Sequence, residues 1–435
     1  MNRWRMGRLL LVGIPLFLTG QCLAQEIIAI PRNASGVYAV GEPIEWRVSV
    51  KNAGAAPVTQ VRYVLKEGGL TVVKKGALDV SAGAAVLRTK LDAPQSLLVE
   101  LVAKVGSKET KSLVGAVAAP EQIPVSAPRP AGFDAFWDKQ IEQLKAIPLK
   151  AAVASGDSGK SGVDYFKVTL DNIRGSHVYG QLARPHRRGK FPAMLLLQYA
   201  GIYPLPKANV VSPAEAGWLA LNIMAHDLPL DRPDGYYKQI AATTLKDYMT
   251  AGNDDRERSY YLRMYLGCYR AVEYLSGRDD WDGRTLVVRG VSQGGLQAIV
   301  TAGLHPKVTA MIAGVPAGCD PTGPWVGRAG GHPYWYNNAK GKPNEKQIME
   351  TSRYFDVVNF ASRVKCPSLV ALGLIDQTCP PAGVLSACNQ LRGPKEVIIL
   401  VGSDHKGTHG TQELFKSRSA AWITSLVKGN NPPIK

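Results

Sequence analysis

Short runs of alternating apolar and polar residues fill the first quarter of the chain. Residues Ile44 to Val50 alternate in this way, which is typical of a strand with one buried face. Similar runs, separated by turns such as Gly41-Glu42-Pro43, are Val61 to Leu65, Leu70 to Val73 and Leu97 to Val105. We therefore predict an all-β domain with an immunoglobulin-like sandwich over residues 25–125.

Three aromatic residues in this region allow two interpretations. Tyr38, Trp46 and Tyr63 could form a face on which sugar rings stack. Aromatic side chains of strands more commonly belong to the core, because they bury a large apolar area. We favour the core, and the sugar-stacking alternative stays open at this point.

The pattern changes after a proline-rich linker, residues 120–130. From Phe133 to Leu144 apolar residues recur at helical spacing, which predicts an amphipathic helix. Strand-like and helix-like runs then alternate. The predicted strands are 163–170, 177–182, 193–197, 219–224, 286–288, 310–313, 369–372 and 397–401, and the clearest helices are 261–275 and a final one that carries Leu414, Phe415, Trp422 and Leu426.

This alternation predicts an α/β domain over residues 126–435, built on a doubly wound, mostly parallel sheet. The runs 163–170 and 177–182 are expected to form an antiparallel pair. In such sheets the functional groups follow the carboxyl ends of the strands. A length of 435 residues also favours two domains over one core.

The N-terminal residues 1–24 have the pattern of a signal peptide. Arg3, Arg5 and Arg8 precede an apolar run from Leu9 to Leu18, and Ala24 offers a cleavage site. This run is too short to span a bilayer, and no later stretch approaches about 20 apolar residues. Cys22 could accept a lipid, but Gln21 stands where a small residue is usual. We expect an exported protein, periplasmic or extracellular, with no transmembrane segment.

The formal net charge of +17 becomes +14 when the three arginines of the signal peptide are removed (17 − 3). A basic protein can attract nucleic acid, membranes or acidic polysaccharides. The basic residues are spread along the chain, however, and no nucleic-acid-binding motif is present. We interpret them as a solvated surface and expect no nucleic-acid partner.

Five cysteines remain after the signal peptide, namely Cys268, Cys319, Cys366, Cys379 and Cys388. Their odd number and the absence of paired short spacings argue against a disulfide framework or a zinc site. One bridge is possible, but buried free thiols are favoured.

A candidate nucleophile follows the predicted strand 286–288. Gly290-Val291-Ser292-Gln293-Gly294 has the G-x-S-x-G pattern between a strand and a helix, where a sharp turn exposes the serine hydroxyl. The amide of Gln293, at the start of the helix, would face the oxygen on which negative charge develops. An ordinary glycine-rich turn with a surface serine is the alternative, and five residues alone do not exclude it.

Chain order selects the partners of Ser292. In α/β-hydrolases the acid and then the histidine follow the serine, each after a strand. Asp376 follows strand 369–372 in a turn rich in glycine and proline, and His405 follows strand 397–401. His409 is the rival base and Asp404 the weaker rival acid. The remaining histidines, His177, His186, His226, His305 and His332, do not fit this order.

A second oxyanion donor is expected in the turn after an early strand. Residues 198–203 supply a glycine turn there, and the amide of Ile202 is our candidate.

At this point the sequence resembles the acetyl xylan esterase / cephalosporin C deacetylase family of carbohydrate esterases, over roughly residues 128–427. The most specific similarity is Lys365-Cys366-Pro367 followed by Gly373-Leu374-Ile375-Asp376 and Cys379-Pro380-Pro381. Other matching segments are Phe133-Asp134-Ala135-Phe136-Trp137, Gln198-Tyr199-Ala200-Gly201, residues 260–273, Gly290 to Gly295, Tyr354-Phe355-Asp356 and Asn359-Phe360-Ala361.

The resemblance implies Ser292 as nucleophile, Asp376 as orienting acid, His405 as base and the amides of Ile202 and Gln293 as oxyanion donors. Three segments depart from the family. Ile202 replaces a usual tyrosine, Ala225-His226-Asp227-Leu228-Pro229 replaces an arginine–glycine turn, and Asp404-His405-Lys406 replaces Gly-His-Glu. These departures bear on substrate preference more than on chemistry. The N-terminal region lies outside the family core, so the family's hexamer is not assumed and the oligomeric state stays open.

We therefore predict an exported serine esterase that removes acetyl groups from acetylated oligo- or polysaccharides through an acyl-enzyme, without a metal or organic cofactor. One alternative is another serine hydrolase on the same fold, a peptidase or a hydrolase of bulkier esters. A second is a polysaccharide-binding protein with an inactive hydrolase domain, which an intact Ser, Asp and His in the right order disfavours.

Overall fold

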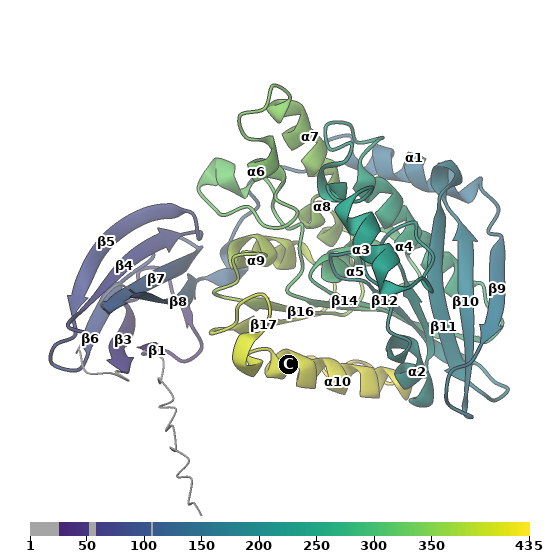
Figure 1. The fold of residues 1–435 in the computed structure, drawn as a ribbon, viewed down its shortest axis with the longest axis horizontal. Helices are drawn as coiled ribbons and strands as arrows, with labels where there is room; N and C mark the ends of the chain where they lie inside the picture. The colour runs from purple at the N-terminus through teal and green to yellow at the C-terminus, as the bar shows by residue number, and fades with distance from the viewer. Residues whose placement is uncertain (1–25, 52–57, 106–107) are drawn as a thin grey trace, which may run out of the picture.

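The computed structural model describes residues 26–51, 58–105 and 108–435 (Figure 1). The predicted signal peptide lies outside these residues. The chain forms an N-terminal part made of strands alone, here called the β region, and a larger part that we call the α/β region. The β region contains β1 (Glu26–Pro31), β2 (Val37–Tyr38), β3 (Ile44–Lys51), β4 (Gln60–Glu67), β5 (Thr71–Asp79), β6 (Ala85–Thr89), β7 (Gln95–Val105) and β8 (Lys108–Ala118).

Two sheets enclose the core of the β region. One has the strand order β1-β3-β6 and the other β2-β8-β7-β4-β5. Tyr38, Trp46 and Tyr63 are only 5%, 1% and 8% exposed and pack between the sheets. The core interpretation of these aromatic residues is confirmed, so they offer no sugar-stacking face.

The α/β region is built on a nine-stranded sheet with the order β17-β16-β15-β14-β12-β13-β11-β10-β9. The pairs from β17 to β13 are parallel, and those from β13 to β9 are antiparallel, including the predicted pair of β10 and β11. The predicted mostly parallel sheet is therefore confirmed. Its strands are β9 (Ala151–Gly156), β10 (Val163–Asp171), β11 (His177–Pro185), β12 (Phe191–Leu197), β13 (Leu219–Ile223), β14 (Trp281–Val291), β15 (Ala310–Gly314), β16 (Ser368–Gly373) and β17 (Lys395–Leu400).

Helices cover both faces of this sheet (Figure 1). Helices α2 (Ala208–Glu215) and α10 (Glu413–Val427) pack on one face. The opposite face carries α1 (Phe133–Lys145), α4 (Tyr260–Ser276), α5 (Gln293–Leu304), α7 (Glu345–Phe355), α8 (Val357–Ala361) and α9 (Pro381–Gln390). The chain also forms α3 (Asp234–Ala242), α6 (Trp335–Ala339) and the short 3₁₀ helices η1 (Pro120–Gln122), η2 (Ile173–Gly175), η3 (Tyr248–Thr250), η4 (Gly323–Val326) and η5 (Thr408–Gly410).

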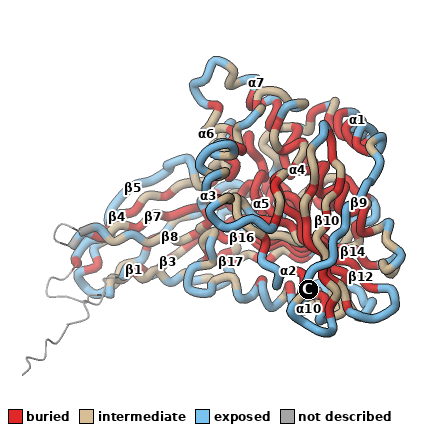
Figure 2. Tube along the Cα trace, turned by 45° about the vertical axis from the view of Figure 1, so that its right-hand side comes forward, coloured by how far each residue is buried: buried red, intermediate tan, exposed pale blue. Residues whose placement is uncertain are grey.

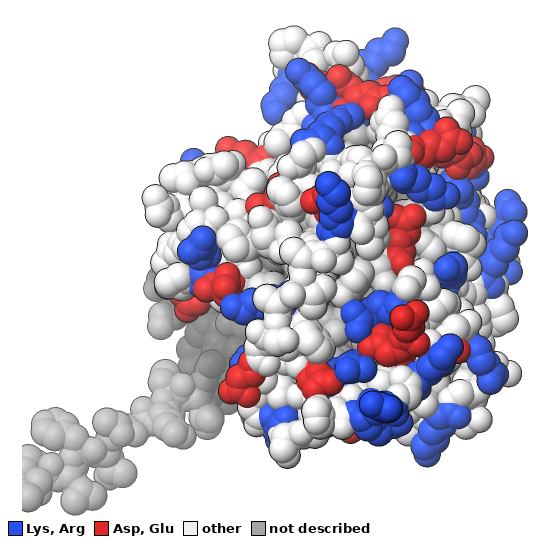
Figure 3. Space-filling model, turned by 90° about the vertical axis from the view of Figure 1, so that its right-hand side faces the viewer, with Lys and Arg blue, Asp and Glu red and all other residues white. Residues whose placement is uncertain are grey.

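The central strands are the most buried part of the molecule, as Figure 2 shows. Every residue of β13, β15 and β16 is buried, which explains why these strands are apolar except for Asn222 in β13 and Ser368 in β16. No helix within residues 26–51, 58–105 and 108–435 is long and apolar enough to cross a membrane. Basic and acidic side chains are interspersed on the face drawn in Figure 3, in keeping with a solvated basic surface. Cys268, Cys319, Cys379 and Cys388 are buried free thiols, and Cys366 is a half-buried one.

Candidate active site

Ser292 stands in a strained turn between β14 and α5. Its φ of 57° and ψ of −122° are sparsely populated for a residue with a side chain, and such strain is typical of functional turns. A Cβ on Gly290 would lie 2.3 Å from the carbonyl carbon of Gly294, and one on Gly294 would lie 2.4 Å from the Leu197 oxygen. Both glycines of the motif are therefore required by close backbone approach, which argues against an ordinary surface turn.

The three strand-end residues selected by chain order lie together. His405 Nε2 is 2.9 Å from Ser292 Oγ, and His405 Nδ1 is 2.8 Å from Asp376 Oδ2. The second oxygen of Asp376 accepts hydrogen bonds from the amides of Thr378 and Cys379, each at 2.8 Å. Asp376 is only 2% exposed, so its carboxylate is held away from water and aimed at the imidazole.

The alternative base, His409, and the alternative acid, Asp404, lie in the same loop as His405. His409 is an exposed residue of η5. Asp404 accepts hydrogen bonds from the amide and the hydroxyl of Thr408 at 2.9 and 2.6 Å. Partial burial acts to raise the pKa of Asp404, but the bonds from Thr408 lower it below its usual value. The carboxylate of Asp404 thus stabilises its own turn, and His405 is the histidine beside Ser292.

The turn 198–203, which we call the oxyanion turn, follows β12. The Gln198 side chain closes it, because Nε2 donates to the Tyr203 oxygen at 3.0 Å and Oε1 accepts from the Ala225 amide at 2.9 Å. Gln297 of α5 donates to the Gln198 backbone oxygen at 2.9 Å. The turn that carries Ile202 is thereby tied to the helix that begins with Gln293.

His226 is a further residue of this site that sequence reasoning set aside. It is 1% exposed, and its Nε2 lies 3.1 Å from the Gly201 oxygen while its Nδ1 lies 2.7 Å from the Tyr260 hydroxyl. Burial lowers the pKa of His226 to about 4, so the ring is neutral at neutral pH. Since a carbonyl only accepts, Nε2 carries the proton and Nδ1 accepts from Tyr260. The only sequence feature that pointed to a role for His226 was the departure from the family at residues 225–229, where this chain has a histidine in place of the usual arginine–glycine turn.

Asp376, Cys379 and His405 also offer donor atoms of the type that bind metals, all within 4.8 Å of one another. Burial raises the pKa of the Cys379 thiol well above its usual value, which disfavours the thiolate that a metal needs. Asp376 and His405 are already joined by the hydrogen bonds described above. The cluster is explained by these bonds and by a neutral thiol.

This arrangement has the parts that acyl transfer from an ester requires: a serine beside an imidazole, a buried acid behind it and a backbone turn near a helix N-terminus. The sequence matches the acetyl xylan esterase (AXE1) family over residues 123–425. The chain belongs to the acetyl xylan esterase family. The predicted resemblance is confirmed, and the protein is a carboxylic ester hydrolase.

Among its relatives, acetyl esterase Axe7A of Xylanibacter ruminicola is 31% identical over 407 residues, which cover 92% of this chain and 90% of that protein. The solved acetyl xylan esterase of Paenibacillus sp. R4 is 26% identical with a TM-score of 0.58, and covers 68% of this chain and 96% of its own. Acetyl xylan esterase 1 of Thermoanaerobacterium sp. JW/SL YS485 has a TM-score of 0.61 at 20% identity, with 71% and 97% covered. The second similarity shows the fold alone.

Proposed function

We propose that this family member removes acetyl groups from acetylated oligo- or polysaccharides such as acetyl xylan, with Ser292, His405 and Asp376 as a catalytic triad. The continuous hydrogen bonds from Ser292 Oγ through His405 to Asp376, 2.9 and 2.8 Å long, carry this proposal. Membership of the acetyl xylan esterase family supports an acetyl ester as the bond that is cleaved, and the xylan in the family's name supports a carbohydrate as the molecule that carries it.

In the proposed reaction, His405 Nε2 accepts the proton of Ser292 as Oγ attacks the acetyl carbonyl. The amides of Ile202 and Gln293 donate hydrogen bonds to the oxyanion. His405 then donates this proton to the departing sugar oxygen, and the acetyl group remains bound to Ser292 Oγ as an ester. Water, deprotonated by His405, attacks this ester and releases acetate and free Ser292. The residues alone carry these steps, and we assign no cofactor.

We also propose that the two parts of the chain are domains. Residues 25–125 form an immunoglobulin-like sandwich, and residues 126–435 form an α/β-hydrolase domain. Residues 1–24 direct export of the protein to the periplasm or the medium. The two facing sheets of the β region support the sandwich, and the basic and apolar pattern of residues 1–18 supports export.

Acetate release from acetylated xylo-oligosaccharides, compared between wild type and Ser292→Ala, tests the reaction. We expect release by the wild type and a loss of roughly 10⁶ in kcat in the variant, by analogy with other serine hydrolases. More than a tenth of the activity in Ser292→Ala would remove the serine from its role. Serine-dependent cleavage of feruloyl esters or peptides without acetate release would favour the other class of serine hydrolase.

A further inference from the structure

Two strands of the β region are buried on both faces where they approach the α/β region. All residues from Ser96 to Val99 of β7 and from Gly115 to Ala118 of β8 are buried. In β8 the side chains alternate, since Ala116 and Ala118 pack in the core of the β region and Val117 packs with the core of the α/β region. One end of the five-stranded sheet, where β7 begins and β8 ends, therefore lies against the α/β region (Figure 1).

This end of the sheet contacts the loop that carries Asp376, residues 374–380, which we call the acid loop. A Cβ on Gly115 would lie 2.6 Å from the Leu374 oxygen and 2.9 Å from its carbonyl carbon, so the two backbones are in direct contact. A cavity of about 110 Å³ remains beside this contact. It is lined from one side by Ser96 and Leu98 and from the other by Asp376, Gln377 and Pro380.

A second path joins the β region to the acid loop through residues 327–332, here called the docking segment. Gly69 forms a β-bridge with Arg328, and the Ala329 amide donates to the Gly68 oxygen at 2.8 Å. At the other end of the segment, the His332 amide donates to the Thr378 oxygen at 2.7 Å. The acid loop is thus held by the β region directly and through a short run of backbone hydrogen bonds.

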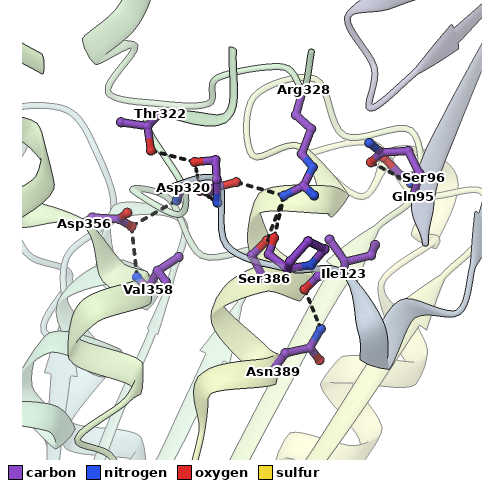
Figure 4. Close-up of polar contacts among 12 residues, drawn as sticks. Gln95, Ser96, Ile123, Asp320, Thr322, Arg328, Asp356, Val358, Ser386 and Asn389 are labelled. Carbon is purple, nitrogen blue, oxygen red and sulfur yellow. Dashed lines mark hydrogen bonds and ion pairs between the residues drawn. The ribbon is translucent and has the colours of Figure 1, made fainter. Parts of the chain in front are cut away.

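Figure 4 shows how the docking segment is itself anchored. Arg328 is 6% exposed and its Nη1 donates to the Pro124 oxygen at 2.5 Å and to Asp320 Oδ2 at 3.4 Å. Asn389 of α9 donates to the Ile123 oxygen at 3.0 Å. Burial raises the pKa of Asp320, although Ser126 and Arg328 oppose that rise. This buried polar network fixes the linker and the docking segment to α9, whose first residue, Pro381, directly follows the acid loop.

We propose that the β region is a positioning element for Asp376, and that Gly115 and Leu98 are the positioning residues through which it acts. The inference rests on the proposed role of Asp376 in the triad. The solved acetyl xylan esterases of Paenibacillus and Thermoanaerobacterium match 68% and 71% of this chain, and the family match starts at residue 123, after β8. In this chain a part outside the family match therefore holds the acid of the site.

The test is a double-mutant cycle measured on p-nitrophenyl acetate. Gly115 has an ordinary strand backbone, so Gly115→Val introduces the clash with Leu374 without strain of its own. Because a misplacement of about 1 Å in a catalytic group can cost roughly 10² in rate, we expect kcat to fall by about 10- to 100-fold with KM nearly unchanged. In an Asp376→Asn background, which alone should lose roughly 10⁴ in kcat, Gly115→Val should add no further loss.

A merely structural role predicts equal losses in both backgrounds, and that result would overturn the proposal, as would a folded Gly115→Val with wild-type kcat. Should Gly115→Val not fold, the same cycle with Leu98→Ala decides, because Leu98 lines the cavity beside Asp376 and its truncation enlarges that cavity instead of crowding the loop. Val48→Ala is the matched control: Val48 is fully buried in β3 of the other sheet, so the variant should lower the denaturation midpoint and leave kcat unchanged. An Asp376→Asn variant with wild-type kcat would instead contradict the proposed triad.

Discussion

The two segments that frame Ser292, the oxyanion turn and the acid loop, are held in place by different means. The oxyanion turn is fixed by side chains of its own region: Gln198 and Gln297 bond its backbone, and His226 bonds the Gly201 oxygen. The acid loop is fixed by backbone packing, since Leu374 lies against Gly115 and the docking segment bonds Thr378.

The difference predicts how each segment responds to change. A turn that depends on individual side chains loses its geometry when one of them is removed. A loop that depends on backbone contact is insensitive to most polar substitutions, because the contacting atoms are present whatever the side chain, and responds instead to added bulk. Three predictions test this comparison, in addition to the two experiments above.

The largest effect is expected at His226. Removing its ring in His226→Ala frees the Gly201 carbonyl and with it the amide of Ile202, so kcat should fall by roughly 10²-fold, close to the loss of one oxyanion donor. His226→Gln, whose amide can donate to Gly201 and accept from Tyr260, should recover part of the loss. His305→Gln is the matched control, because burial also lowers the pKa of His305 to about 4 and its ring lies against Tyr269 instead. Equal kcat in His226→Ala and wild type would show that the turn holds without this side chain.

A smaller effect concerns stability in acid. Burial lowers the pKa values of His226, His305 and His332 to about 4, below the value of about 6.5 in the unfolded chain. At pH 5 the unfolded state therefore binds protons that the folded state does not, and stability decreases as the pH falls from about 6.5 towards 4. Each histidine contributes a slope of about 1.4 kcal/mol per pH unit in this window.

Urea unfolding of wild type and His226→Gln at pH 7, 6 and 5 measures this slope. The variant should take up about one proton fewer on unfolding, so its unfolding free energy should depend less on pH. The carboxylates common to both proteins contribute equally to both slopes, so they do not affect the difference between wild type and variant. Identical slopes would mean that His226 is not buried in its neutral form.

The smallest effect is expected at Thr71, whose hydroxyl donates to the Gly327 oxygen at 2.9 Å on the surface of the docking segment. Thr71→Val removes this bond but leaves the backbone bridge of Gly69 and Arg328. We expect a loss of no more than about 1 kcal/mol in unfolding free energy and less than about a twofold change in kcat. A decrease in kcat as large as that of Gly115→Val would show that side-chain bonds hold the acid loop as well.

Much of the α/β region could be predicted because its central strands are mostly apolar and helices such as α1 and α4 have one apolar face. In the β region the predictions failed where the pattern of exposed and buried residues departs from simple alternation. Strand β5 was placed at 70–73 but runs from Thr71 to Asp79, since it is an edge strand with almost every residue exposed. Strand β8 was missed, because its last residues are buried on both faces by two different cores.

The sequence by itself determined the local features of this protein. It placed Ser292 between two glycines after a strand, and Asp376 and His405 after later strands, because parallel strands bring their carboxyl ends to one edge of a sheet. Only the tertiary structure placed His405, and not His409, beside Ser292, brought His226 to Gly201 and laid β8 against the acid loop. These contacts join residues that are far apart in the chain or turn in opposite directions within one loop, and no local pattern of hydrophobic and polar residues records them.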